Sequence, residues 1–85
     1  SSDFADYFVI MSASSVRQIN SLSESIDKGL RDAGLTRHHK EGIASSGWVL
    51  LDFGDLIIHI FGIEQREYFN LESAWSQATE VIRLQ

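Results

Sequence analysis

Apolar residues recur at steps of three and four positions between residues 15 and 33, and this spacing is compatible with few folds. The repeat places one apolar stripe on a single helix face, formed by Val16, Ile19, Leu22, Ile26, Leu30 and Ala33. Ser14 or Ser15 can cap the start of this helix, and Gly34 suits the left-handed residue that often follows a helix end. The sequence therefore predicts an amphipathic helix over residues 15–33 that buries its stripe against another layer.

Short apolar segments on both sides of this helix predict that the other layer is a β-sheet. Residues 6–11 are β-rich and almost entirely apolar, which is typical of a strand buried on both faces. A second strand over residues 36–41 completes a β-α-β crossover, so the two strands should run in parallel. Residues 42–47 have the composition of a loop.

Residues 48–52 and 55–61 flank Phe53-Gly54 and are expected to form a β-hairpin. If Asp52 pairs with Asp55, one side is aliphatic throughout, with Val49, Leu51, Leu56, Ile58 and Ile60. The other side is then mixed, with Trp48, Leu50, Asp52, Asp55, Ile57, His59 and Phe61. A glycine bulge at Gly54 would shift the pairing by one residue and remove this segregation. We favour the first register, which predicts a core face and a second face for a partner or a thin cover.

The remaining residues are predicted to add helices rather than a second domain. Residues 64–69 and 71–84 look helical, with an inner stripe of Tyr68, Leu71, Trp75, Ala78 and Ile82. A chain of 85 residues with 44% hydrophobic and 22% charged residues suits one folded domain. The expected fold class is α/β (α+β), a single small domain with a mixed sheet.

The charge balance excludes the usual kind of nucleic-acid-binding domain. The net charge is -5, whereas a domain that neutralises phosphates normally carries a basic face. We therefore expect little or no direct nucleic-acid binding and a basic protein partner. The chain has no cysteine, no apolar run near the ~20 residues that span a bilayer, and no charged region typical of a signal peptide at its start. A cytoplasmic location and no membrane contact are expected.

Asp52, Asp55 and His59 are the candidates for metal binding or acid–base chemistry, because two carboxylates and an imidazole can hold a divalent ion. Aspartate is also common beside turns, where its side chain accepts from backbone N–H groups, and a histidine on an apolar strand is more often structural. We favour this second interpretation. His38-His39 with Glu41 is interpreted as a solvated strand edge.

No other pattern indicates catalysis. The sequence has neither a Gly-x-Ser-x-Gly elbow nor a phosphate-binding glycine loop. We therefore expect no enzymatic activity, no cofactor and no metal.

Aromatic residues gather in the C-terminal half, namely Trp48, Phe61, Tyr68, Phe69 and Trp75. Most should be core residues in so small a domain, but tryptophan and tyrosine are also favoured interface anchors. Trp48 opens the mixed face of the hairpin and is the first candidate for a partner contact. Arg66 is expected either to pair with Asp52, Asp55 or Glu72 or to contact the partner.

Two adjoining segments carry a resemblance to a known family. They read Trp48-Val-Leu-Leu-Asp-Phe-Gly-Asp-Leu-Ile-Ile-His-Ile-Phe61 and Glu64-Gln-Arg-Glu-Tyr-Phe-Asn-Leu-Glu-Ser-Ala-Trp75. Residues 5–10, Ser14-Ser15 and Glu41-Gly42 also fit, so the likeness covers residues 4–76. Together these segments resemble the RsfS/Iojap family of ribosomal silencing factors.

The resemblance implies a fold related to nucleotidyltransferases without their catalytic motif. It implies a protein that binds large-subunit ribosomal protein fourteen, blocks joining of the subunits and represses translation under nutrient limitation. A role in ribosome biogenesis and a homodimer in the free state are also implied, in the bacterial cytoplasm or, alternatively, in an organellar stroma or matrix. The partner-binding residues carried over are Trp48, Leu50, Asp55, His59, Arg66, Tyr68 and Phe69.

The chain also departs from the family pattern. We interpret residues 1–85 as one domain that lacks the helix usually preceding the first strand and that adds residues 77–85 as an extension. Ile63 occupies a position where relatives often carry proline. Two alternatives stay open at this point, a nucleotidyltransferase-like domain that binds nucleotide or metal through Asp52 and Asp55, and a generic homodimerisation module.

Overall fold

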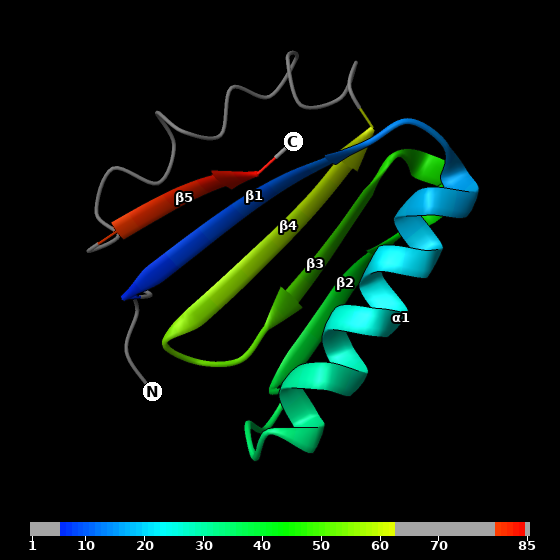
Figure 1. Ribbon diagram of the computed structural model, residues 1–85. Helices are drawn as coiled ribbons and strands as arrows, with labels where there is room; N and C mark the ends of the chain where they lie inside the picture. The colour runs from blue at the N-terminus through cyan, green and yellow to red at the C-terminus, as the bar shows by residue number, and fades with distance from the viewer. Residues whose placement is uncertain (1–5, 63–79, 85) are drawn as a thin grey trace.

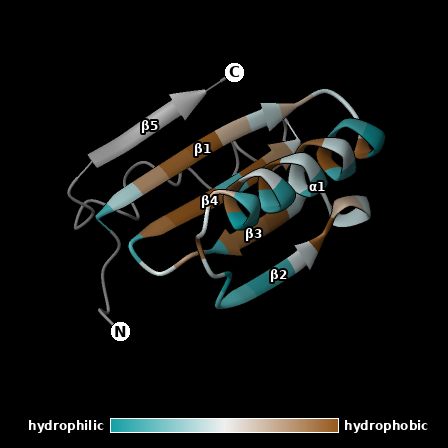
Figure 2. Ribbon diagram, turned by 60° about the horizontal axis from the view of Figure 1, so that its bottom comes forward, coloured by the Kyte–Doolittle hydropathy of each residue, from teal (hydrophilic) through white to brown (hydrophobic). Residues whose placement is uncertain are grey.

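The computed structural model describes residues 6–62 and 80–84, which form a small α+β domain (Figure 1). Along the chain the elements are β1 (Tyr7–Ala13), α1 (Val16–Asp32), β2 (His39–Ile43), the 3-10 turn η1 (Ala44–Ser46), β3 (Trp48–Asp52), β4 (Leu56–Gly62) and β5 (Glu80–Leu84). Within these residues the strands form one mixed sheet in the order β2-β3-β4-β1-β5. Helix α1 covers one face of the sheet (Figure 2). No helix in this described part is long and apolar enough to cross a membrane.

The strand directions confirm the predicted β-α-β crossover, and the strand order shows that two further strands lie between its two strands. Strand β1 pairs in parallel with β4 and β5, whereas β3 runs antiparallel to both of its neighbours, β2 and β4. Strand β2 therefore runs in the same direction as β1, as expected for a β-α-β unit. The hairpin of β3 and β4 lies between these two strands, which leaves β2 at the edge of the sheet.

Helix α1 confirms the prediction over residues 15–33. Its N-cap is Ser15, whose hydroxyl accepts a hydrogen bond from the backbone N–H of Gln18 at 3.1 Å. The Gln18 side chain accepts in return from the backbone N–H of Ser14 at 2.5 Å. Gly34 follows the helix with a φ of 102°, a conformation that glycine adopts without a steric penalty.

The buried stripe of α1 is shorter than predicted. Ile19 is buried and Leu22, Ile26 and Leu30 pack on the core beneath the helix. The prediction was wrong for Val16, which is 47% exposed, and for Ala33, which is also exposed. These two residues are the first residue of the helix and its C-cap, so they lie at its two ends rather than over the middle of the sheet.

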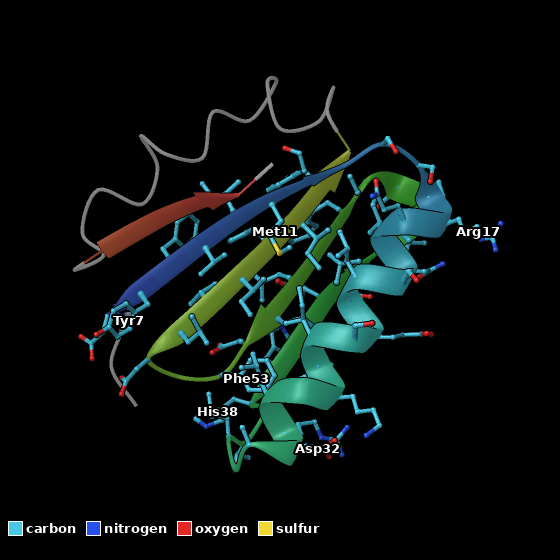
Figure 3. All side chains as sticks on the ribbon, viewed as in Figure 1. Tyr7, Met11, Arg17, Asp32, His38 and Phe53 are labelled. Carbon is cyan, nitrogen blue, oxygen red and sulfur yellow. The ribbon has the colours of Figure 1, made fainter. Side chains whose placement is uncertain are left out.

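The sheet has an apolar cluster on each face. The cluster under α1 contains the buried residues Ala13, Ile19, Ala44, Val49, Leu51, Phe53, Ile58 and Ile60. The cluster on the opposite face contains Phe8, Ile10, Ile57 and Phe61, with Trp48 and Leu50 packed against it. Figure 3 shows Met11 and Phe53 on the side of the sheet that faces α1.

The hairpin register differs from the prediction by two residues. Trp48 pairs with Phe61 and Leu50 with His59, and the backbone N–H of Phe53 donates to the carbonyl oxygen of Leu56 at 2.8 Å. The loop is therefore Gly54-Asp55, because Gly54, with a φ of 88°, provides the positive φ that a tight hairpin needs at its first loop position. Side chains alternate with a period of two, so this shift keeps every residue of β3 and β4 on its predicted face, whereas Asp55, predicted to pair with Asp52, lies in the loop.

Two other segment predictions require correction. The strand expected at residues 36–41 is formed by His39–Ile43, so the first residues of the expected loop belong to β2 and are followed by η1. Gly42 marked a loop in the sequence, but it lies inside β2, where the backbone and ring of Trp48 leave no room for a Cβ atom.

The helix predicted over residues 71–84 is wrong for residues 80–84, which form β5 beside β1. Val81 and Ile82 are β-branched residues, and the free edge of β1 allows them to pair as a strand. The rest of that helix and the one predicted over residues 64–69 lie outside the described residues.

Candidate protein-binding surface

The sheet face opposite α1 changes from buried to open along its width. On β1 and β4, Phe8 is 0% and Phe61 1% exposed. On β3, Trp48 and Leu50 are partly exposed, and Ile43 on the edge strand β2 is 64% exposed. Ile43 pairs with Trp48 and Glu41 pairs with Leu50, so these four side chains share one face. We call this set, Glu41, Ile43, Trp48 and Leu50, the β2–β3 margin.

Trp48 is held in place by residues on both neighbouring strands, Gly42 on β2 and His59 and Phe61 on β4. It is the first residue of β3 and follows Gly47, which has a φ of 87°. Its indole Nε1–H donates to Nδ1 of His59 at 2.9 Å. Its ring also stacks against His59 and Phe61, with centroid distances of 6.0 and 6.3 Å. Trp48 as a whole remains partly exposed, which makes it a candidate for a partner contact.

His59 is a buried structural residue, as its position on an apolar strand suggested. Its side chain is 3% exposed, and its ring lies 4.8 Å from that of Phe8 and 5.7 Å from that of Phe61. Burial lowers the pKa of His59 to about 4, so the imidazole is neutral near pH 7. Because Nδ1 accepts the indole hydrogen bond, the ring proton is assigned to Nε2.

The structure brings together three of the residues predicted to bind a partner, Trp48, Leu50 and His59. Asp55 is exposed in the hairpin loop, at the end of β3 opposite Trp48. The remaining three, Arg66, Tyr68 and Phe69, lie outside the described residues. Ile43 was not predicted to belong to this surface, because Gly42 and the serines after it suggested a loop. The signal for it was an apolar side chain within an otherwise polar and exposed segment.

The described residues favour the structural interpretation of Asp52 as well. Its Oδ1 accepts from the backbone N–H of Gly54 at 2.8 Å, the turn role expected for an aspartate at this place. Among the described residues, no three His, Asp or Glu side chains are placed to hold a metal ion. His39 and Glu41, 3.6 Å apart, are exposed on β2, in agreement with a solvated edge.

A surface hollow of about 610 Å³ lies at the C-terminal end of α1 and shares no residue with the β2–β3 margin. Its lining residues are Asp27, Lys28, Arg31, Asp32, Leu35, Thr36 and Arg37. Asp27 pairs there with Arg31 at 3.3 Å and with Arg37 at 2.9 Å, which ties the loop after the helix to α1. Neither Asp52 nor Asp55 lines the hollow, so it offers no support for a nucleotide site built on those carboxylates.

The charges on the β2–β3 margin are acidic. Lys40 is the one lysine or arginine within strands β2, β3 and β4, and it pairs with Leu51 on the face that α1 covers. On the margin face, Glu41 is exposed and Asp52 is partly exposed. An apolar surface bordered by carboxylates suits a partner that is basic and carries apolar side chains.

Comparison with known proteins identifies the family. The family model described as "Ribosomal silencing factor during starvation" matches residues 1–85. A ribosomal silencing factor RsfS of Halalkalibacterium halodurans is 34% identical over 77 residues, which cover 91% of this chain and 66% of that protein. The chloroplastic protein Iojap of Zea mays is 36% identical over 78 residues, covering 88% of this chain and 32% of that protein.

The fold has a counterpart among solved structures. A crystal structure of a Chromobacterium violaceum protein aligns with a TM-score of 0.73 at 33% identity, over 78% of this chain and 55% of that one. The chain thus spans less than two thirds of the length of the matched bacterial and plant relatives. The full-length family match and the identity to relatives from bacteria and from a plastid show that the chain belongs to the RsfS/Iojap family of ribosomal silencing factors.

Proposed function

We propose that this chain binds the large ribosomal subunit through ribosomal protein fourteen and so prevents the small subunit from joining. The observation that carries the proposal is the placement of Trp48, a partly exposed residue whose ring is oriented by a hydrogen bond to His59 within an apolar and acidic margin. Tryptophan is the residue type most enriched among the few that dominate binding energy at interfaces. The result in the cell would be repression of translation when nutrients are limited.

The charge of the chain supports a protein partner rather than ribosomal RNA. With a net charge of -5 the domain would be repelled by phosphates and attracted to a basic ribosomal protein. A standard interface covers about 800 Å² on each partner, which is a large share of a domain of this size. The β2–β3 margin would form the centre of that interface, and the strand ends around it would form the rim.

Silencing by this route requires occupancy and steric overlap but no chemical step. The proposal therefore assigns the fold a binding role, although its topology is expected to be related to that of nucleotidyltransferases. It places the protein in the bacterial cytoplasm or, as for the plastid relative, in an organelle. A homodimer of the free chain forms part of the proposal, with the same margin as its interface, so that dimerisation and ribosome binding would compete.

The proposal is tested by measuring the affinity of the purified chain for ribosomal protein fourteen. Trp48→Glu should weaken binding by about 30-fold or more, since tryptophan hot spots typically contribute 2 kcal/mol or more. Ile43→Glu should weaken it as well, because this side chain extends the same surface. Val16→Glu is the matched control, because Val16 is 47% exposed on α1, away from the margin.

A second assay links binding to function. Isolated large subunits are incubated with the chain, small subunits are added, and the yield of joined ribosomes is measured by sedimentation. The wild-type chain and Val16→Glu should lower the yield, whereas Trp48→Glu should leave it unchanged. Circular dichroism verifies that each variant is folded. A wild-type chain that binds neither the ribosomal protein nor the large subunit would refute the proposal.

A further inference from the structure

Trp48 has a single polar group, and that group is already used inside the domain. Its indole Nε1–H donates to Nδ1 of His59 at 2.9 Å. The two residues lie on neighbouring strands, where Trp48 is directly opposite Phe61 and His59 is directly opposite Leu50. His59 is therefore the diagonal neighbour of Trp48, a distance that aromatic side chains can bridge across a sheet.

Building on the docking function proposed above, we propose that His59 is a positioning residue for that function. By accepting the indole N–H it fixes the orientation of Trp48 and makes the exposed part of the ring an aromatic surface without a hydrogen-bond donor. The side chain on the partner that this surface recognises is then aliphatic or cationic, packed against the ring, and not a hydrogen-bond acceptor.

The surroundings of His59 suit this positioning role, because a buried side chain cannot contact a partner directly. The side chain is 3% exposed, and its ring is flanked by Phe8 and Phe61 at centroid distances of 4.8 and 5.7 Å. Burial among these rings keeps the imidazole neutral, so that Nδ1 is an acceptor near pH 7. The imidazole thus accepts the hydrogen bond of the Trp48 indole N–H, which a water molecule would otherwise have to accept.

Fixing the ring before the partner arrives would increase affinity. A tryptophan that is free to change rotamer must be ordered on binding, and ordering a side chain at an interface reduces affinity. The strands on both sides hold the backbone of Trp48 and His59 in register, so the hydrogen bond needs only to select the orientation of the indole. This is a contribution to binding by a residue that does not touch the partner.

Two substitutions of matched shape separate the acceptor from the volume of the side chain. In His59→Asn the amide oxygen lies the same number of bonds from Cα as Nδ1 and can accept from the indole. In His59→Leu a methyl group takes that place and no acceptor remains. We expect His59→Leu to weaken binding to ribosomal protein fourteen by about 5- to 10-fold, as for a hydrogen bond of ordinary strength, and His59→Asn by about 2-fold or less.

A double-mutant cycle with Trp48→Phe tests whether His59 acts through Trp48. Phenylalanine keeps an aromatic ring but has no N–H, so His59→Leu should cause no further loss of affinity in the Trp48→Phe background. If the losses in the two single variants simply add, or if His59→Leu binds like the wild type while folded, the positioning role is wrong. If the wild-type chain does not bind at all, it is the docking function that fails.

A measurement on the wild-type chain tests the hydrogen bond between Trp48 and His59 and does not depend on whether a His59 variant folds. In the nitrogen-15 NMR spectrum, His59 should show an unprotonated Nδ1 and a protonated Nε2, and the Trp48 indole N–H should exchange slowly with water. The spectrum of Trp48→Phe identifies which of the two indole signals belongs to Trp48. A protonated Nδ1, or an indole proton that exchanges as fast as in free tryptophan, would overturn the proposed hydrogen bond and with it the positioning role.

Discussion

Acidification should destabilise this domain through His59 in a defined pH window. Burial lowers the pKa of His59 in the folded chain to about 4, from 6.5 when it is exposed to water. As the pH falls through 6.5 the unfolded chain binds a proton at this residue, whereas the folded chain binds it only near pH 4. The extra proton stabilises the unfolded state, so stability decreases between these two values and is unaffected by His59 at higher pH.

The size of the effect follows from linkage. One proton bound by the unfolded state alone changes the free energy of unfolding by about 1.36 kcal/mol per pH unit. Between about pH 7 and about pH 4.5 the expected loss from His59 is about 2 kcal/mol, a large fraction of the stability of a small domain. Protonation at Nδ1 would also replace the acceptor of the Trp48 indole with a donor, which is a further reason for the folded chain to stay unprotonated at His59 above about pH 4.

Urea unfolding followed by circular dichroism at stepwise pH values measures this effect in the wild type and in His59→Leu. The carboxylates are the same in both chains, so their contribution cancels in the difference between the two curves. The free energy of unfolding of His59→Leu should rise relative to that of the wild type by about 2 kcal/mol towards acid pH. Curves for wild type and His59→Leu that stay parallel would refute the assignment of His59 as a buried neutral residue.

Three substitutions test other features by the same unfolding assay. Gly42→Ala should destabilise the domain by more than about 1 kcal/mol and change Trp48 fluorescence, because Gly42 has a φ of 80° and a Cβ there would collide with Trp48. Unchanged stability would contradict this close approach. Gly29→Ala should stabilise by about 0.5–1 kcal/mol, because Gly29 is within the helix and nothing lies within 4 Å of the added Cβ; destabilisation would show hidden crowding. Ser15→Ala should cost about 1 kcal/mol through loss of the N-cap bond to Gln18, and no cost would mean that the cap is not formed in solution.

The parts of the fold that could be predicted from the sequence are those governed by local periodicity. The three- and four-residue spacing located α1, and the alternation in residues 48–61 separated the core face of the hairpin from the other face. That separation survived a register error of two residues, because a shift by two returns each side chain to the same face. The exposed ends of the helix stripe, Val16 and Ala33, show that periodicity assigns a face but not how far the sheet extends beneath it.

Features that depend on contacts between distant segments could not be predicted in this way. The insertion of β3 and β4 between β1 and β2 is a choice of strand order, which no local pattern encodes. The strand at residues 80–84 exists because β1 offers a free edge, and an apolar stripe alone had suggested a helix there. Gly42 was misinterpreted for the same reason, because the group that excludes a side chain at this position is Trp48, on the next strand.

Strand order also explains why the candidate site lies where it does. Trp48 was identified from its residue type, its place on the mixed face of the hairpin and the family resemblance, but its availability comes from β2, an edge strand whose residues are all exposed. On the same face the described neighbours towards β4 and β1 are buried, so the exposed approach to Trp48 in this part of the structure runs across Ile43 and Glu41. A partner that uses this route meets Ile43 directly beside the tryptophan ring, and the carboxylate of Glu41 two residues along the same edge strand. This arrangement favours a basic residue with a long aliphatic stem, because its stem can pack on the two apolar side chains while its charge reaches Glu41.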